Sequence, residues 1–243
     1  MTRPTLLFDL GGVVVPWVGF EAVAGLTGLD REAIDDRFQS EPALRRFETG
    51  HSTPEEFCAA LPATLGLDIA PTSVPTLWKS WVLPPYPGVV EAITRLKATH
   101  RTACLSNTNA LHWAHFSTFF DPDALFDAPM ASHHLGAAKP DAEIYAIALE
   151  RLGVAPGDVW FFEDTRKNLD AAARIKPNRD AVYDAARIED VVSKVLDEAA
   201  RAGLSADIAE PVWRTLIARC IAHEFDRFDA TRGEGRIEGR GAA

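Results

Sequence analysis

The chain has 243 residues, of which 47% are hydrophobic and 25% are charged, and its formal net charge is -10. This length suggests one large domain, or one domain that carries an insert. The acidic balance argues against a general nucleic-acid binder, which needs a basic face, and no stretch is apolar enough to span a membrane. The short apolar start is interrupted by Asp9 and lacks a cleavage site of small residues, so no signal peptide is predicted.

The cysteines indicate the compartment. Cys58, Cys104 and Cys220 are an odd number of thiols at wide spacing. This pattern fits small buried side chains in a reducing environment better than it fits a disulfide scaffold or a zinc site. We therefore expect a cytoplasmic protein that binds neither nucleic acid nor membrane.

Short apolar runs alternate with helical stretches along the chain. Strands are expected over 5–10, 101–107, 125–132 and 158–164. Helices are expected over 20–40, 53–66, 89–100 and 141–153. Thr53, with Glu56 three residues later, predicts a capping box at the start of the second of these helices. Strands separated by helices predict an α/β fold, with a doubly wound parallel sheet covered on both faces.

Polar side chains lie where the predicted strands end. Asp9 follows the first strand, Ser106 and Asn107 end the second, and Glu163 and Asp164 end the fourth. Ligands of parallel sheets bind at the carboxyl ends of the strands, so these side chains are expected to share one site. A lone residue of this kind is usually a cap or turn residue, but several of them at strand ends favour a common site.

The residue types at this predicted site indicate phosphoryl chemistry. Three carboxylates can hold a divalent cation, and hard oxygen ligands with few nitrogens favour magnesium over zinc. Lys139, just before the helix over 141–153, adds a cation for an anionic group. Asp9 can attack phosphorus and form an aspartyl-phosphate that water then hydrolyses. Lys139 and the metal would neutralise charge on the transferred group.

The segments FDLGGVV, LSNTN, AKPDAEIY and FFEDTRKN occur in this order within residues 5 to 170. Together they resemble the four motifs of the haloacid dehalogenase-like (HAD) hydrolase superfamily. The resemblance implies that Asp9 is the nucleophile, Ser106 the phosphate-holding hydroxyl and Lys139 the charge-stabilising lysine. The implied Mg2+ ligands are Asp9, Glu163, Asp164 and the carbonyl of Gly11. The implied substrate contacts are Gly11, Ser106, Asn107 and Lys139.

The resemblance also implies a domain plan. The expected parts are a Rossmann-like core over 1–16 and 85–177, an inserted helical cap over 17–84, a C-terminal helical segment over 178–230 and a flexible tail over 231–243. The proline-rich stretch 83–88 marks a boundary in the same place. Residues 180–183 can supply the last core strand. The polar, glycine-rich tail contains Ile-Glu-Gly-Arg, which reads like a protease-tag site.

Gly11 departs from the common pattern of the superfamily. Its common phosphatases have an aspartate there, which protonates the leaving group and later activates water, and loss of such a group costs a factor on the order of 10² to 10⁴ in rate. The Asp-Leu-Gly text most resembles the sugar-1-phosphate phosphatase-like branch. Three alternatives remain open. The leaving group is good enough without a donor, another side chain or the substrate supplies the proton, or the protein is a weak or vestigial hydrolase.

The acidic pair and the lysines separate chemistries within the superfamily. Glu163 and Asp164 favour phosphate over halide, because a dehalogenase binds no magnesium and does not need them. A phosphonate hydrolase would need a cap lysine, and Lys79 has no supporting pattern.

Other residues of chemical interest have a plainer interpretation. His112 and His115 are either metal ligands or surface and cap contacts, and the second alternative is favoured. The tryptophans of the expected cap either line a substrate entrance or pack its core, and core packing is favoured. They are Trp17, Trp78 and Trp81.

The C-terminal part resembles a second family. Residues 181–225 look like the last two helices of an all-helical chorismate mutase, with Asp184, Arg187 and Glu224 at its substrate-contacting or structural positions. Lys176 lies only approximately where that family has a lysine. The segment is either a set of helices appended to a complete hydrolase core or a fusion to an incomplete mutase. In the fusion, a first helix would have to come from a partner.

An apolar stripe recurs along 213–225, and it would bury against the core or against another subunit. A homodimer through this helix is therefore expected. Three functions remain: a magnesium-dependent hydrolase of a small phosphomonoester such as a sugar phosphate, a chorismate-binding or chorismate-rearranging module, and a phosphoryl-binding protein without turnover. The hydrolase, with a small phosphorylated metabolite as its partner, is favoured.

Overall fold

The structure is a computed structural model that describes residues 4–40, 42–175 and single positions between 189 and 214. The chain divides into two compact units, Met1–Ala171 and Ala172–Ala243. The predicted strand at 180–183 and the predicted tail over 231–243 lie outside the described residues. So does the apolar stripe over 213–225, apart from position 214, so the homodimer stays a prediction.

A four-stranded parallel sheet with the order β3-β2-β1-β4 forms the centre of the first unit. Its strands are β1 (Thr5–Phe8), β2 (Thr102–Ser106), β3 (Ala128–Ala131) and β4 (Val159–Phe162). Each strand lies inside a stretch predicted to be a strand, and the α/β fold class is confirmed. In the register of the sheet, Phe8 of β1 is level with Cys104 on one side and Phe162 on the other. The carboxyl ends of β1, β2 and β4 therefore meet at one edge.

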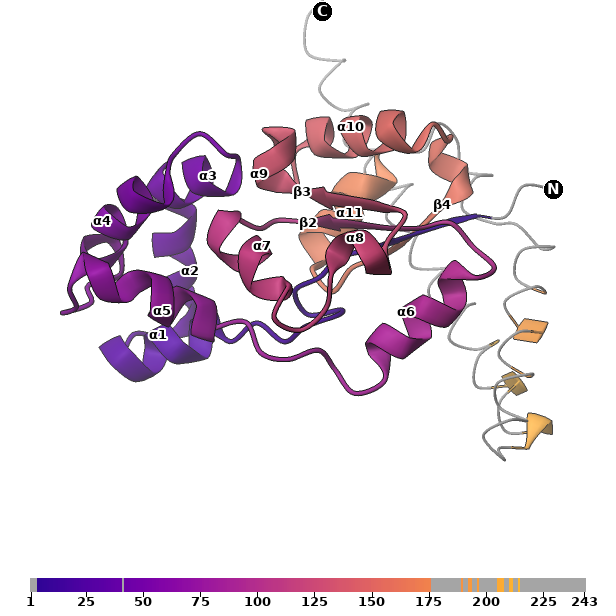
Figure 1. Ribbon diagram of the computed structural model, residues 1–243, viewed down its shortest axis with the longest axis horizontal. Coiled ribbons are helices and arrows are strands. Elements are labelled where there is room, and N and C mark those ends of the chain that lie inside the picture. The colour runs from indigo at the N-terminus through magenta and orange to yellow at the C-terminus, as the bar shows by residue number, and fades with distance from the viewer. Residues whose placement is uncertain are drawn as a thin grey trace, which may run out of the picture. The chain divides into compact units, whose positions relative to one another are not determined.

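Helices cover both faces of this sheet (Figure 1). On one face, α6 (Val89–Lys97), α7 (Ala110–Phe116) and α8 (Pro122–Leu125) share a hydrophobic cluster with Leu6 and Phe8. On the other face, α10 (Ala142–Leu152) brings Tyr145 against Phe161, with ring centroids 6.1 Å apart. Successive side chains of a strand point to opposite faces, so strands covered on both sides are apolar throughout.

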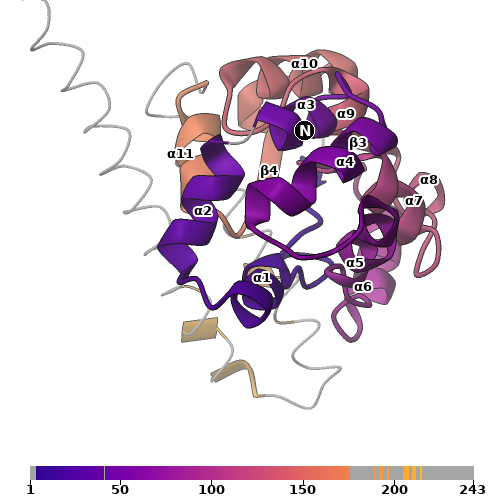
Figure 2. The ribbon, with the colours of Figure 1, turned by 90° about the vertical axis from the view of Figure 1, so that its left-hand side faces the viewer.

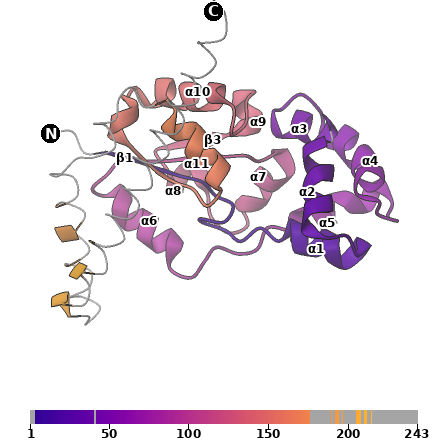
Figure 3. The same cartoon turned by 180° about the vertical axis from the view of Figure 1, so that it is seen from behind.

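The helix α11 (Arg166–Ala173) lies beside α10, as the view from behind shows (Figure 3). The two helices are joined by a hydrogen bond of 2.8 Å, in which the Tyr145 hydroxyl donates to the carbonyl of Asn168. The remaining short elements of the sheet-containing part are α9 (Ser132–Leu135), directly after β3, and the 3-10 helix η2 (Pro156–Asp158), directly before β4.

Five helices and a 3-10 turn lie between β1 and α6, and we refer to residues 19–80 as the helical insert (Figure 2). They are α1 (Gly19–Thr27), α2 (Arg31–Ser40), α3 (Pro42–Glu48), α4 (Pro54–Leu65), η1 (Pro71–Ser73) and α5 (Val74–Ser80). The insert has a hydrophobic cluster of its own, built around Phe47, Phe57 and Trp78. The predicted capping box is present at α4, where Thr53 and Glu56 exchange side chain-to-backbone hydrogen bonds.

The two connections between the insert and the sheet pair with each other. Trp17 and Val82 form an antiparallel bridge, and the backbone N–H of Leu83 donates to the carbonyl of Pro16 over 3.0 Å. The proline-rich stretch 83–88 begins at this pairing. The chain therefore enters and leaves the helical insert at the same place, as expected for an insertion into an existing fold.

A second contact joins α5 of the insert to α7 of the core. The Trp78 and His112 rings stack with centroids 5.0 Å apart, and the His112 Nε2 lies 2.8 Å from the Trp78 carbonyl. The Trp78 indole N–H also donates to Asn109 Oδ1 over 3.3 Å. His112 is thus a contact to the insert. Trp78 and Trp81 are buried in the core of the insert, as favoured from the sequence.

Within the described part of the chain, no helix combines the length and the apolar character needed to cross a membrane.

Candidate active site

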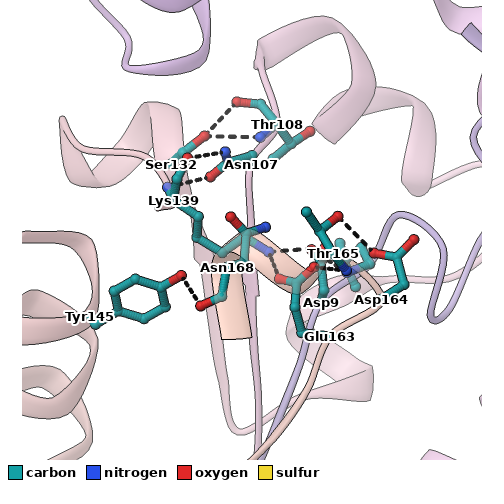
Figure 4. Close-up of polar contacts among 11 residues, drawn as sticks. Asp9, Asn107, Thr108, Ser132, Lys139, Tyr145, Glu163, Asp164, Thr165 and Asn168 are labelled. Atoms are coloured by element: carbon teal, nitrogen blue, oxygen red, sulfur yellow. Dashed lines mark hydrogen bonds and ion pairs between the residues drawn. The ribbon is translucent and has the colours of Figure 1, made fainter. Parts of the chain in front are cut away.

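Five of the predicted site residues lie at one edge of the sheet. Asp9 directly follows β1, Ser106 is the last residue of β2, and Glu163 and Asp164 directly follow β4. Lys139 comes from the loop between α9 and α10. Figure 4 shows the side chains of Lys139, Asp9 and Glu163 meeting at one point, with Asp164 to one side next to Thr165.

Lys139 is the centre of the site. Its side chain is fully buried, and its Nζ lies 2.9 Å from Asp9 Oδ2 and 2.6 Å from Glu163 Oε2. Burial acts to lower the pKa of Lys139, but the attraction of the Asp9 and Glu163 carboxylates outweighs it, and the pKa lies above its ordinary value. The lysine therefore stays charged, and it supplies the opposite charge for two carboxylates at the buried end of the site.

Asp9 is held at both oxygens. Its Oδ1 accepts a hydrogen bond of 2.7 Å from the backbone N–H of Leu10, and its Oδ2 faces Lys139. Burial raises the pKa of Asp9 from 3.8 to about 6, with Lys139 opposing this rise and the neighbouring Glu163 adding to it. The carboxylate is therefore fixed in orientation and only weakly solvated, unlike the carboxylate of an ordinary surface turn.

Asp9, Glu163 and Asp164 form an acidic cluster, in which each offers a carboxylate oxygen within 4.8 Å of the others. Burial and the neighbouring Glu163 raise the pKa of Asp164. Gly12 follows β1 with a φ of +73°, and a Cβ atom there would overlap the Asp164 carboxylate. Only glycine lets the backbone come this close to Asp164, so the loop after β1 closes one side of the cluster.

Glu163 is more fully engaged with the protein than Asp164 is. Its Oε2 receives Lys139, and its Oε1 accepts a hydrogen bond of 3.0 Å from the backbone N–H of Thr165. Burial acts to raise the pKa of Glu163, but Lys139 and further hydrogen bonds, one from Asn168, bring it below its ordinary value. Asn168 and Thr165 were not anticipated from the sequence, although both lie in the FFEDTRKN segment.

Two reciprocal clamps hold the loops around Lys139 (Figure 4). The Asn107 Oδ1 accepts from the Lys139 backbone N–H over 2.7 Å, and its Nδ2 donates to the Lys139 carbonyl over 2.8 Å. Next to it, the Ser132 hydroxyl accepts from the Thr108 backbone N–H and donates to the Thr108 carbonyl, both over 2.9 Å. Asn107 was predicted as a substrate contact, and that role stays a prediction. In the structure, its amide positions Lys139.

The positions of the other predicted residues, Ser106 and Gly11, follow from the backbone. Ser106 is buried and is level with Ala131 in the sheet register. Gly11 has no heavy atom within 4 Å of the place where a Cβ atom would stand, and its φ is not positive. The structure thus brings Asp9, Lys139 and Glu163 into direct contact, and it leaves open space where a side chain at position 11 would stand.

Comparison with known families agrees with this geometry. Residues 4–176 match the family model described as haloacid dehalogenase-like hydrolase. The chain belongs to the HAD hydrolase family. The prediction of a hydrolase is therefore confirmed, and the four motifs that suggested it contribute the residues of the acidic edge described above.

Relatives with assigned names are similar over about two thirds of the chain. The mouse protein acyl-CoA dehydrogenase family member 10 is 32% identical over 184 residues, which are 70% of this chain but only 17% of the mouse protein. D-ribitol-5-phosphate phosphatase of Bacteroides thetaiotaomicron is 25% identical over 173 residues, which cover 68% of this chain and 84% of that enzyme.

Solved structures share the fold. A HAD-family enzyme of B. thetaiotaomicron, determined with magnesium and inorganic phosphate, has a TM-score of 0.61 and 23% identity, over 76% of this chain and 98% of that one. Farther along the sequence, residues 167–225 match the family model of chorismate mutase type II. The resemblance inferred for the C-terminal segment is therefore confirmed as a resemblance, and the two matches overlap at residues 167–176.

Proposed function

We propose that the protein is a magnesium-dependent hydrolase of small phosphomonoesters that works through an aspartyl-phosphate on Asp9. The observation that carries this proposal is the buried contact of Asp9 with Lys139, beside the acidic cluster. A carboxylate fixed next to a charged lysine and a cation site is the arrangement that nucleophilic attack on phosphorus requires.

The residues of the acidic cluster fit Mg2+. The cluster offers only oxygen atoms, and its carboxylates are close enough together for one small, hard cation. We assign the three carboxylates of the cluster, Asp9, Glu163 and Asp164, together with the Gly11 carbonyl, as its ligands. When bound, Mg2+ neutralises charge on the phosphoryl oxygens. The related fold of a HAD-family enzyme determined with magnesium and phosphate supports this choice.

The chain's own residues divide the remaining work. The Asp9 carboxylate attacks phosphorus, and the leaving oxygen departs with the electron pair of the broken P–O bond. Lys139 holds Asp9 in place and balances the charge of the phosphoryl group, and Asn107 fixes Lys139 through its backbone. Ser106 donates its hydroxyl to a phosphoryl oxygen. Water then attacks the aspartyl-phosphate and regenerates Asp9.

For the substrate, we propose a phosphorylated sugar or sugar alcohol. One relative of this chain is named as a D-ribitol-5-phosphate phosphatase, and a second, from Thermotoga maritima, as a phosphorylated carbohydrates phosphatase. The chain spans 40% of the second relative. This support comes from sequence similarity, and the helical insert is the part of the chain that would select among such compounds.

Phosphate release tests the proposal. D-ribitol 5-phosphate, glucose 1-phosphate, glucose 6-phosphate and p-nitrophenyl phosphate should be assayed with Mg2+ and with a chelator in its place. We expect turnover of at least one compound that depends on Mg2+ and disappears in Asp9→Asn. The matched control is Asp68→Asn, which changes an exposed aspartate of the helical insert. Turnover that survives Asp9→Asn would refute the nucleophile, and the absence of wild-type turnover would leave a phosphoryl-binding protein.

A second candidate function concerns the C-terminal segment. The match over 167–225 supports a chorismate-binding or chorismate-rearranging module. Its candidate residues Lys176, Asp184, Arg187 and Glu224 lie outside the described residues. The full chain should therefore be assayed for loss of chorismate. Activity that is lost in Arg187→Ala and kept in Asp9→Asn would support this module, and no activity in the wild type would contradict it.

A further inference from the structure

The site lacks a proton donor for the leaving group at the position where the sequence pattern has one. Gly11 has no side chain, and the carboxylates of Asp9 and Glu163 are both bound to Lys139. An alkoxide such as the oxygen of a sugar alcohol is a poor leaving group without a proton. A donor must therefore come from a part of the protein that faces the substrate.

Helix α3 of the helical insert packs against the segment that carries Lys139. Arg45 of α3 forms an ion pair with Asp141, two residues after Lys139. The turn after α3 contains Gly50, where a Cβ atom would overlap the carbonyl oxygen of His133 in α9. These two contacts join the segment 45–50 to α9 and to the loop after α9, which supplies Lys139.

Glu48 is the last residue of α3 and stands three positions after Arg45, so both lie on the same side of the helix. The positive charges that act on the Glu48 carboxyl are those of Arg45 and Lys139. Lys139 is also the partner of Asp9. Because Arg45 meets Asp141 in the loop that supplies Lys139, Glu48 lies on the side of α3 that is turned toward this loop.

The backbone around Glu48 is held in place. The hydroxyl of Thr49 donates to the carbonyl of Arg45 over 2.8 Å and lies 2.9 Å from the His51 Nδ1. At the same junction, Thr108 Oγ1 and His133 Nδ1 are buried and have no hydrogen-bond partner within the described residues. Buried polar atoms without partners are uncommon, and a hydroxyl-rich leaving group would supply what they lack.

We propose that Glu48 is the general acid and base of this site and replaces the carboxyl that Gly11 lacks. As Asp9 attacks phosphorus, the P–O bond to the leaving group breaks, and the Glu48 carboxylic acid gives its proton to the departing oxygen. The Glu48 carboxylate then takes a proton from the water that attacks the aspartyl-phosphate. The bond from phosphorus to Asp9 breaks, and both side chains return to their starting states. The inference rests on the proposed hydrolase function.

The electrostatic surroundings of Glu48 suit this role. Burial raises the pKa of Glu48 from 4.5 to about 7, against the opposing charges of Arg45 and Lys139. A carboxyl with such a pKa is present in both protonation states near neutral pH, as an acid that must also act as a base requires.

Other ionisable side chains also lie on α3's neighbouring elements and on the turn that follows α3. Burial, together with His134, lowers the pKa of His133 to about 4, so this ring is neutral at pH 7. Asp141 is paired with Arg45. His51 contacts the hydroxyl of Thr49, and Arg37 of α2 lies against Gly66.

Two phosphate esters with different leaving groups test the proposal. For D-ribitol 5-phosphate and glucose 6-phosphate, Glu48→Gln should lower kcat/KM by a factor on the order of 10² to 10⁴. For p-nitrophenyl phosphate, whose product leaves without a proton, the first burst of nitrophenolate should stay close to the wild-type rate. The aspartyl-phosphate should then accumulate, because water is no longer activated. The matched control, Glu55→Gln on the exposed side of α4, should behave as the wild type.

A rescue experiment separates chemistry from damage to the fold. Gly11 has room for a side chain. The double variant Gly11→Asp, Glu48→Gln should therefore hydrolyse sugar phosphates at least about tenfold faster than Glu48→Gln alone. The wild type should also lose kcat toward them above about pH 7, where Glu48 is deprotonated, and Glu48→Gln should lack this decline.

The outcomes distinguish this inference from the proposed function. If Asp9→Asn is inactive while Glu48→Gln hydrolyses sugar phosphates at the wild-type rate, Glu48 is not the acid, and the hydrolase proposal stands. Equal losses for the sugar phosphates and for the nitrophenolate burst would also overturn the inference, since they indicate structural damage. No phosphate release by the wild type would overturn both proposals.

Discussion

Two adjacent glycines after β1 have different physical reasons to be glycine. Gly12 has a φ of +73°, and a side chain there would overlap Asp164, whereas Gly11 has an ordinary φ and open space around it. Gly12 is therefore required by the backbone and by the acidic cluster. Gly11 is not required by sterics, which fits a site in which the acid was moved to another residue rather than excluded by lack of room.

Alanine should be harmful at Gly12 and tolerated at Gly11. Gly12→Ala should lower the free energy of unfolding by about 1–3 kcal/mol, because the residue is forced into a strained backbone conformation. It should also weaken the affinity for Mg2+ by a factor on the order of ten, because Asp164 must move. Gly11→Ala should leave both quantities nearly unchanged. Urea unfolding and Mg2+ titration of phosphate release measure the two effects. Equal behaviour of the two variants would contradict the assignment.

At the residue scale, the sequence predicted Asp9, Lys139, Glu163 and Asp164 as neighbours, because strand ends of a parallel sheet meet at one edge. It did not predict the clamp between Asn107 and the backbone of Lys139. An amide side chain has no spacing signal that distinguishes a substrate contact from a contact to another loop. The polar neighbours Thr165 and Asn168 were missed for the same reason.

At the scale of elements, the helices with clear caps and periodic apolar residues were predicted well. The capping box at Thr53 marks the start of α4, and α10 ends at Gly153, as the sequence indicates. The helices α3 and α5 were not delimited from the sequence, and each has a proline in its first turn, Pro42 and Pro75. Proline is tolerated in the first turn of a helix, where its missing N–H has no partner in any case.

The contact between α5 and α7 makes the attachment of the helical insert sensitive to acid. Burial lowers the pKa of His112 from 6.5 to about 4, although its hydrogen bond to Trp78 acts in the opposite direction. Between these two values the unfolded chain binds a proton that the native ring does not. The stability due to neutral His112 is therefore fully present above about pH 6.5 and is lost as the pH falls toward 4.

His112→Phe should remove this pH dependence while it keeps the stacking on Trp78. At pH 7 the variant should be less stable by about 1 kcal/mol, because one hydrogen bond is lost. Between pH 7 and pH 5, the wild type should lose about 2 kcal/mol more of its free energy of unfolding than the variant does. Urea unfolding at the two pH values measures the difference. Parallel losses in the two proteins would show that His112 does not titrate in this way.

At the scale of the whole molecule, the HAD family match over residues 4–176 includes all four strands of the described sheet, and the match to chorismate mutase type II begins inside α11. Both resemblances were predicted from short sequence motifs. The sequence could not predict that α3 packs against the loop that supplies Lys139, because this packing depends on contacts between residues far apart in the chain, such as Arg45 and Asp141. The substrate preference has no motif for the same reason.

Binding at the site should stabilise the first unit as a whole. Five of the six tryptophans precede Ala171, and Trp213 is the sixth, so emission from Trp213→Phe reports the first unit alone. If Mg2+ and inorganic phosphate bind the proposed site in the folded protein only, they should raise the free energy of unfolding by about 2.7 kcal/mol when the free ligand is roughly 100 times its Kd. Adding Asp164→Asn should remove most of this rise, because the acidic cluster loses a ligand, whereas Asp68→Asn should keep it. Urea unfolding followed by tryptophan emission measures the shift. An equal shift in the Asp164→Asn variant would place the cation elsewhere in the molecule.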